Sequence, residues 1–312
     1  MSTPELPFPD GGAPTGPVEA PTVPVDVPVD VPVDVPVDVP VDVPVDVPVG
    51  VGAATRRARL LVAYDGSGFH GFAEADAQPT VMGVLREALE RVTRIAVAPV
   101  GAGRTDAGVH AWGQVVSVDL PADTDLDRLA HRLNRLCGPA IVVREVAWCV
   151  DPAFSARFSA QWRHYRYHVL AAPVPVPALA ATTWHVPARL DLWAMQLACD
   201  PFIGEHDFAS FCRLPKVRAD QEAPSLRRRV LLAQWSRVES DYGSLLRFEI
   251  RANAFCHQMV RSIVGTMVDV GSGALHAGQI RGILLARSRQ VAGRVAPPHG
   301  LTLWEVGYGD AR

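Results

Sequence analysis

A four-residue unit ending in proline dominates the start of this chain. From Val25 the unit VDVP repeats, so that proline stands at every fourth position and six aspartates recur in register. Proline removes a backbone donor and fixes φ, and at this density it excludes both helix and central strand. We therefore predict that residues 1–54 form an extended, disordered, polyproline-like tail without a core. They contain no basic stretch followed by an unbroken apolar run, so we expect neither a secretory signal nor a membrane span there.

The net charge changes sign when this tail is left out. The 312 residues together carry a formal charge of −3, but residues 1–54 hold nine carboxylates and no Lys or Arg. Residues 55–312 therefore carry 30 basic against 24 acidic side chains. All the basic residues except Lys216 are arginine, whose guanidinium suits phosphate contacts and stacking on bases. An arginine-rich composition can also reflect base bias in a genome, so charge alone favours an anionic partner only weakly.

Cysteine and histidine show no metal-binding or disulfide pattern. The five cysteines are scattered without a CxxC pair, and the ten histidines show no HExxH motif or other paired ligand spacing. We expect no metal, no disulfide framework and a reducing, cytoplasmic location.

The order of apolar patterns in the first half indicates an α+β fold. An apolar run at 57–66 predicts a strand, and the amphipathic segment 80–93 predicts a helix with Thr80 as its N-cap. The pattern then predicts a strand, a second strand, a helix and a final strand, at 94–100, 113–120, 125–137 and 140–148. This βαββαβ order is typical of ferredoxin-like folds, which pack helices on one face of an antiparallel sheet.

The second half repeats the scheme with extra helices. The predicted elements are a strand, a helix, a strand pair, two helices and a last strand, at 161–170, 190–198, 226–238, 244–255, 257–271, 277–288 and 301–308. We therefore predict two ferredoxin-like halves, residues 55–152 and 153–312, that share an extended antiparallel sheet. A cleft between them would be the natural place for a ligand.

The strand at 161–170 carries aromatic and cationic side chains on both faces. Alternation places one set on one face (Arg163, Tyr165, Tyr167, Val169) and the other set on the opposite face (Trp162, His164, Arg166, His168). Several RNA-binding folds stack bases on such a sheet face. Packed tyrosines covered by arginine stems would give the same pattern, so the pattern alone leaves both interpretations open.

The stretch GAGRTDAGVHA at 101–111 surrounds Asp106 with glycines. Glycines at 101, 103 and 108 allow positive φ, which predicts a shaped loop rather than a helix or strand. An aspartate in such a turn often caps its own backbone amides, and a catalytic role is the alternative. The loop joins the middle strands of the first half, from which Asp106 could point into the cleft.

Six stretches together resemble a known family. They are YDGSGFHGF (64–72), GAGRTDAGVHA (101–111), FSARFSAQWRHYRY (154–167), GEHDFASF (204–211), NAFCHQMVRSIVGTMVDVG (253–271) and APPHGLTLWEVGY (296–308). In this order, over roughly residues 57–308, the chain resembles the TruA family of tRNA pseudouridine synthases. The resemblance implies isomerisation of uridine to pseudouridine at positions 38, 39 and 40 of the tRNA anticodon stem-loop. It also implies a homodimer without a cofactor, built from paired ferredoxin-like halves with the active site between them.

The resemblance also implies roles for individual residues. Asp106 matches the essential aspartate, which acts either as a nucleophile on C1′ or as a base at C2′; the sequence leaves this choice open. Arg104 would contact RNA, and Tyr165 would stack on the uracil flipped out of the stem. Arg261 would pair with the aspartate and lower its pKa. Leu301 would form an apolar wall of the pocket.

Four residues depart from the family pattern. Phe72 and Ala73 stand where Trp and Gln are common, and Cys256 and Gln258 replace Leu and His. We expect these changes to affect how the protein binds RNA and which of the three tRNA positions it modifies.

Two alternative functions remain open from the sequence. One is a non-catalytic RNA-binding or RNA-folding module on the same scaffold, and the other is a pseudouridine synthase that acts on another structured RNA. A degenerate module would have been free to lose the carboxylate of Asp106, which this chain retains.

Overall fold

The computed structural model describes residues 54–75, 78–214 and 224–309. They belong to one compact unit, residues 41–312. The predicted tail at 1–54 lies outside the described residues, apart from its last residue. Within the described ranges, no helix is both long and apolar enough to cross a membrane.

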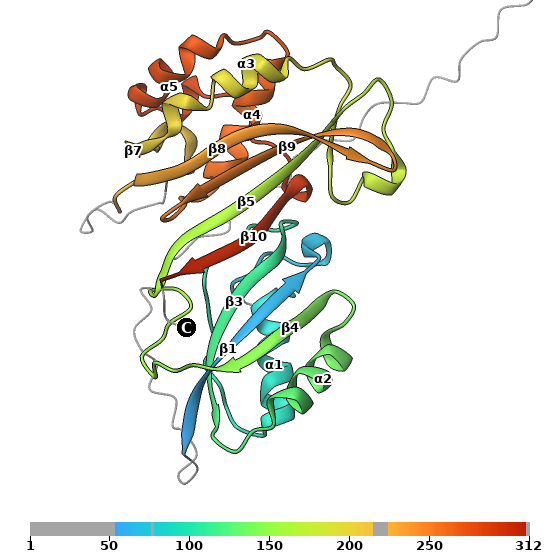
Figure 1. Cartoon of the computed structure of the whole chain (residues 1–312), viewed down its shortest axis with the longest axis vertical. Coiled ribbons are helices and arrows are strands. Elements are labelled where there is room, and N and C mark those ends of the chain that lie inside the picture. The colour runs from blue at the N-terminus through green and yellow to red at the C-terminus, as the bar shows by residue number, and fades with distance from the viewer. Residues whose placement is uncertain (1–53, 76–77, 215–223, 310–312) are drawn as a thin grey trace, which may run out of the picture. The chain divides into compact units, whose positions relative to one another are not determined.

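One mixed sheet contains the described strands (Figure 1). Its order is β4-β1-β3-β10-β5-β9-β8-β7, with β2 paired to β3 and β6 paired to β5. The bounds are β1 Thr55–Tyr64, β2 Val100–Gly101, β3 His110–Pro121, β4 Ile141–Trp148, β5 Ala160–Ala171, β6 Trp184–Val186, β7 Gly204–Asp207, β8 Arg227–Ser240, β9 Gly243–Ala252 and β10 Leu301–Tyr308. The sheet therefore runs without interruption from the first half of the chain into the second.

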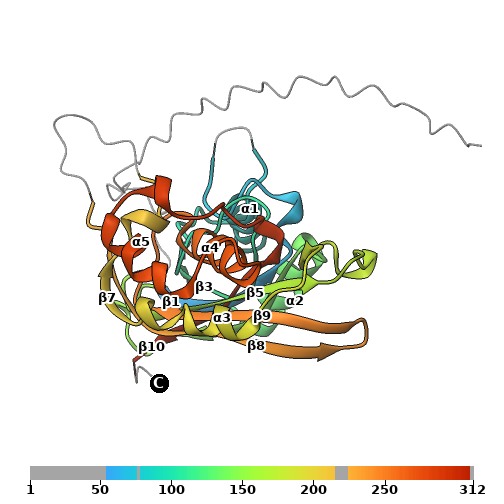
Figure 2. The same cartoon turned by 90° about the horizontal axis from the view of Figure 1, so that it is seen from above.

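The longer helices lie on one side of this sheet, as Figure 2 shows for α1, α4 and α5. The α-helices are α1 Val81–Thr93, α2 Leu126–Cys137, α3 Leu192–Leu197, α4 Met259–Gly271 and α5 Ile280–Ala286. Thr80 accepts a hydrogen bond from the backbone N–H of Gly83, which confirms it as the N-cap of α1. Aspartates at 125 and 191 cap α2 and α3 in the same way.

The element order of the first half is as predicted, but one strand is much shorter. The structure has the order β1-α1-β2-β3-α2-β4, whereas the strand predicted at 94–100 is reduced to Val100–Gly101. Arg94 ends α1 in the left-handed region at φ 61°. The backbone N–H of Val97 then donates to Glu90 on α1 at 3.3 Å, and Pro99 has no N–H to offer a ladder. The segment therefore follows the helix instead of extending the sheet.

The prediction of a wholly antiparallel sheet was wrong. β10 runs antiparallel to β5 over most of its length but pairs with β3 in the parallel sense at Thr302 and Leu303. β6 also runs parallel to β5. β3 and β5 therefore run in opposite directions on either side of β10, so β10 is antiparallel to only one of them. The short strands β6 and β7 were not predicted, because three or four residues carry too little alternation.

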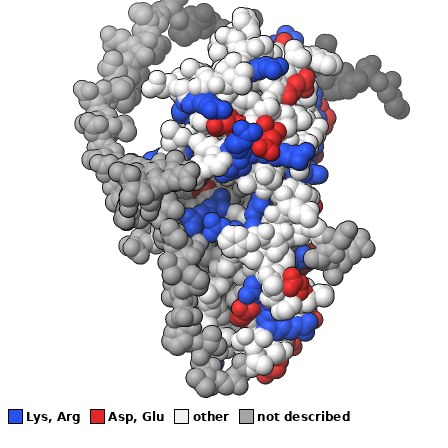
Figure 3. Space-filling model, turned by 90° about the vertical axis from the view of Figure 1, so that its left-hand side faces the viewer, with Lys and Arg blue, Asp and Glu red and all other residues white. Residues whose placement is uncertain are grey.

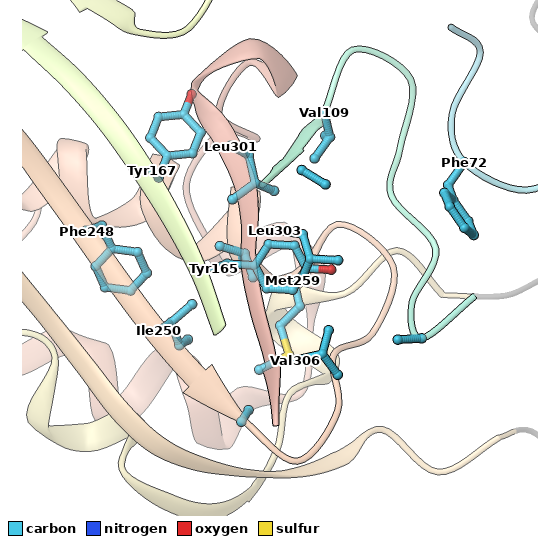
Figure 4. Close-up of a cluster of buried hydrophobic side chains, with 14 of the residues drawn as sticks. Phe72, Val109, Tyr165, Tyr167, Phe248, Ile250, Met259, Leu301, Leu303 and Val306 are labelled. Carbon is cyan, nitrogen blue, oxygen red and sulfur yellow. The ribbon is translucent and has the colours of Figure 1, made fainter. Parts of the chain in front are cut away.

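The hydrophobic core continues from the first half into the second, where β3 pairs with β10 (Figure 4). On the second-half side, Tyr165 of β5 lies opposite Leu303 of β10, and Tyr167 lies opposite Leu301. All four side chains are buried on the helix-covered face, and Tyr165 and Leu303 lie next to Met259 at the start of α4. Helix α4 is itself buried along most of its length. Burial of this apolar surface fixes α4 against the joint, and α4 carries one half of the candidate site.

Candidate active site

Asp106 lies in a shaped loop between β2 and β3. The loop begins where the N–H of Ala102 donates to the carbonyl of Val115 at 2.8 Å, and it turns where the N–H of Val109 donates to the carbonyl of Asp106 at 3.1 Å. Gly108 has a φ of 76°, which a side chain would strain. The loop predicted from the glycines is thereby confirmed.

The segment 64–72 packs beside this loop and forms hydrogen bonds with it. The hydroxyls of Tyr64 and Thr105 lie 2.8 Å apart, and the N–H of Phe72 donates to the carbonyl of Thr105 at 3.0 Å. At Gly66 a Cβ atom would overlap the carbonyl of Val109. The glycine therefore allows the two segments to approach closely, which explains why YDGSG and RTDAG occur together. Phe72 is buried and keeps this support in place of the commoner tryptophan.

The carboxylate of Asp106 contacts an arginine and a histidine from the second half. Nη1 of Arg261 donates to Oδ2 at 2.9 Å, and Nε2 of His257 lies 3.4 Å from Oδ1. Burial acts to raise the pKa of Asp106, but hydrogen bonds and charge from His257 and Arg261 outweigh it and hold that pKa below its usual value. Asp106 is therefore ionised at neutral pH.

Arg261 is aimed at the carboxylate by its own anchors. It lies in the first turn of α4, and its side chain is only 14 % exposed. Its Nε donates to the carbonyl of Ala296 at 2.8 Å, and the N–H of Ala296 donates back to the carbonyl of Arg261 at 3.0 Å. The guanidinium thus has one N–H group fixed on the backbone and another directed at Asp106.

Tyr165 borders the same loop from β5. It is 7 % exposed, and Phe255 contacts its ring edge-on with centroids 5.0 Å apart. Its hydroxyl lies against Gly103, where an added Cβ atom would stand 3.9 Å away. Burial raises the pKa of Tyr165, so the phenol is neutral at physiological pH.

The other two predicted site residues lie at different depths. Arg104 is exposed on the loop, two residues before Asp106. Leu301 is buried at the start of β10. It lies opposite Tyr167, two residues along β5 from Tyr165. The structure therefore brings Asp106 and Arg261 into contact, sets Arg104 and Tyr165 at the loop, and places Leu301 in the adjoining core.

Two supporting residues were missed from the sequence. His257 precedes Arg261 by four residues, a spacing that would have suggested a shared direction near a helix start. Gln114 is fully buried, and its side-chain amide donates to the carbonyl of Gly103 at 2.7 Å. No sequence pattern distinguishes this glutamine from a polar residue on a strand.

A metal site is not formed in the part of the chain that the structure describes. No three His, Cys, Asp or Glu side chains there are grouped so as to hold an ion.

This arrangement defines a class of protein. One ionised carboxylate, held between an arginine and a histidine from the other half of the chain, is typical of an enzyme that uses it as a base or nucleophile. Comparison with known proteins gives the family. A family model described as tRNA pseudouridine synthase matches residues 198–309.

Relatives named tRNA pseudouridine synthase A match most of the chain. The one from Brevibacillus brevis is 40% identical over 253 residues, which are 81% of this chain and 100% of the relative. Those from Bacillus pumilus and Frankia casuarinae are 38% and 41% identical over 81% of this chain and over 99% and 89% of their own lengths. The chain belongs to the tRNA pseudouridine synthase family, a family of isomerases, as its six motifs predicted.

Proposed function

We propose that this protein isomerises uridine to pseudouridine at positions 38, 39 and 40 in the anticodon stem-loop of tRNA. The observation that carries the proposal is the ionised carboxylate of Asp106, held between Arg261 and His257. Membership of the family supports the reaction class. The match of GAGRTDAGVHA and its five companion stretches to the TruA pattern supports the positions.

The reaction explains why a fixed carboxylate is needed. The uracil must leave C1′ through N1, rotate, and reattach through C5. Asp106 acts either as a nucleophile on C1′ or as a base that removes the C2′ proton, and both roles need the ionised form. Oδ2 is occupied by Arg261 at 2.9 Å, while Oδ1 has only the longer contact with the more exposed His257. We assign the contact with the ribose to Oδ1.

The remaining site residues hold the nucleotide. We assign Tyr165 to stacking on the flipped uracil, Leu301 to the apolar wall behind it, and the exposed Arg104 to the RNA backbone. Because the Tyr165 phenol is neutral, the C5 proton passes to a carboxylate or to water rather than to a tyrosinate.

The charge of the surface supports an anionic substrate. Figure 3 shows several Arg side chains in the upper and middle part of one side of the molecule, with Asp and Glu among them. Contacts of such arginines with phosphates of a stem-loop would make binding weaken with salt.

We also propose the finer architecture that the family resemblance implies. Residues 55–152 and 153–312 form two ferredoxin-like halves in a cytoplasmic protein, after a tail at 1–54. The observed order β1-α1-β2-β3-α2-β4 supports this assignment for the first half.

The helix-free face of the sheet supports a homodimer. Figure 1 looks onto this face. Arg144 lies over the ring of Trp112 at 3.8 Å, Trp112 stacks on Trp304 at 6.0 Å, and Arg166 lies over Trp304 at 3.8 Å. Trp112 is 46% exposed. Tryptophan and arginine are enriched where interfaces gain most of their binding energy, and we propose that a second copy packs here.

Pseudouridine mapping tests the proposal directly. Unmodified tRNA with uridines at positions 38, 39 and 40 is incubated with purified protein and no added cofactor, then treated with carbodiimide and read by primer extension. Stops at these positions that vanish with Asp106→Asn are expected. Tight binding of tRNA without stops would instead favour the RNA-binding module, and stops only in other structured RNAs would change the substrate.

A further inference from the structure

Arg163 of β5 connects the two segments that carry the active-site groups. Its Nε and Nη2 both donate to the carbonyl of Ala102, at 3.2 and 2.8 Å, and its Nη1 donates to the carbonyl of Asn253 at 2.9 Å. Ala102 precedes Asp106 by four residues, and Asn253 precedes His257 by four residues. One guanidinium therefore bridges the backbone of the two halves just before each reaches the site.

The guanidinium uses all its N–H groups on backbone carbonyls. Two further hydrogen bonds reach the carbonyls of Arg157 at 2.8 Å and Ala160 at 3.2 Å. With the three above, they account for the five N–H groups that a guanidinium has. Burial lowers the pKa of Arg163, so this placement of a cation has a cost. Five donors in a rigid plane fix the relative position of the segments that they contact, which a lysine cannot do.

The described strand ladder between the halves is short. The ladder between β3 and β10 consists of two residue pairs, at Thr302 and Leu303. The ion pair between Asp106 and Arg261 depends on the separation of the loop from α4. A shift of about 1 Å in a catalytic group can reduce a rate by about 100-fold.

We propose that Arg163 is a positioning residue for the reaction: it holds the Asp106 loop at the distance from His257 and Arg261 that the chemistry requires. This inference rests on the proposed function. It goes beyond it by assigning a role to a side chain that donates to backbone carbonyls and not to the carboxylate.

The test uses the full chain with Arg163→Met and Arg163→Lys, and Arg57→Met as the matched control. Arg57 is a comparable strand arginine that donates to the carboxylate of Asp119 and to the carbonyl of Phe154, away from the Asp106 loop. For Arg163→Met we expect kcat to fall about 100-fold with little change in KM. Arg57→Met should lower Tm without lowering kcat.

A second readout does not depend on turnover. The ionisation of Asp106 is followed by carbon NMR of labelled protein, with the signal assigned by its loss in Asp106→Asn. We expect the pKa of Asp106 to rise in Arg163→Met, because the carboxylate separates from its cations. If Arg163→Met does not fold, Arg163→Lys should show the same direction, since an ammonium cannot hold both segments.

The outcomes separate this inference from the function. Wild-type protein that makes no pseudouridine in any RNA would contradict the proposed function, and the titration would still decide the role of Arg163. A folded Arg163 variant with the wild-type kcat and the wild-type pKa of Asp106 would overturn the inference. An equal loss of kcat in Arg57→Met would also overturn it, because the loss would then not depend on the contacts that Arg163 makes with the Asp106 loop.

Discussion

The ionisation of Asp106 determines where activity should fail in acid. Its pKa is held below the usual value, so the carboxylate stays ionised at neutral pH and is lost only as the pH falls through that lowered value. We expect kcat to be flat from neutral pH down to about 4, the ordinary pKa of an aspartate. In His257→Leu, only Arg261 opposes the effect of burial on the pKa of Asp106, so that pKa should rise. The acid limb of the profile, where kcat falls, should then move to higher pH.

The control for this pH profile is another histidine. His206 lies on β7, where its ring contacts the carbonyl of Ile203, and His206→Leu should leave the acid limb in place. The pH dependence of kcat in single-turnover reactions measures both variants. An acid limb that does not move in His257→Leu would show that this histidine does not contribute to the ionised state.

The residue contacts of the site were predictable only in part. The resemblance pointed to Asp106 and Arg261, but these residues are 155 positions apart, and only the joint between β10 and its neighbours brings them together. Arg163 has no distinguishing local pattern, and the spacing of His257 from Arg261 does not reveal its contact with Asp106, because both roles depend on which carbonyl or carboxylate the fold places nearby. Sequence periodicity gives the face of a strand but not these partners.

At the scale of elements, two glycines in the second half should respond in opposite ways to alanine. In α4 a Cβ atom at Gly265 would overlap the carbonyl of Arg294, just before the segment that anchors Arg261. Gly265→Ala should therefore destabilise the protein by about 3 kcal/mol and lower kcat. Gly282 in α5 has open space, so Gly282→Ala should stabilise by about 0.5–1 kcal/mol. Urea unfolding measures both, and equal effects would contradict this account of α4 packing.

Long elements with a clear period were predicted well, and short ones were not. The helix at 80–93 with its Thr80 cap and the strand at 301–308 match α1 and β10. β2, β6 and β7 have two to four residues each, so neighbouring strands rather than local alternation determine them. The parallel contact of β10 with β3 could not be predicted either, because it depends on how two antiparallel units meet.

At the scale of the whole molecule, the repeat at the start of the chain should be dispensable for catalysis. Its prolines exclude it from any core, and the nine carboxylates of residues 1–54 oppose the charge that an RNA-binding surface needs. Deletion of residues 1–54 should therefore leave Tm and kcat nearly unchanged. Thermal unfolding and pseudouridine formation measure this, with the full chain as reference, and a large loss of either would assign the repeat a structural or catalytic role.

The helix-free face of the sheet should hold two copies of the chain together. Sedimentation of the wild-type protein should give a dimer at micromolar concentration. Trp112→Glu places a carboxylate in the stack between Arg144 and Trp304, so burial against a second copy would leave a charge in the interface, and the variant should sediment as a monomer. Trp193→Glu is the matched control, because Trp193 on α3 is 86% exposed, and it should remain a dimer. A dimer that survives Trp112→Glu would place the contact elsewhere, and a wild-type monomer would rule out this role for the face.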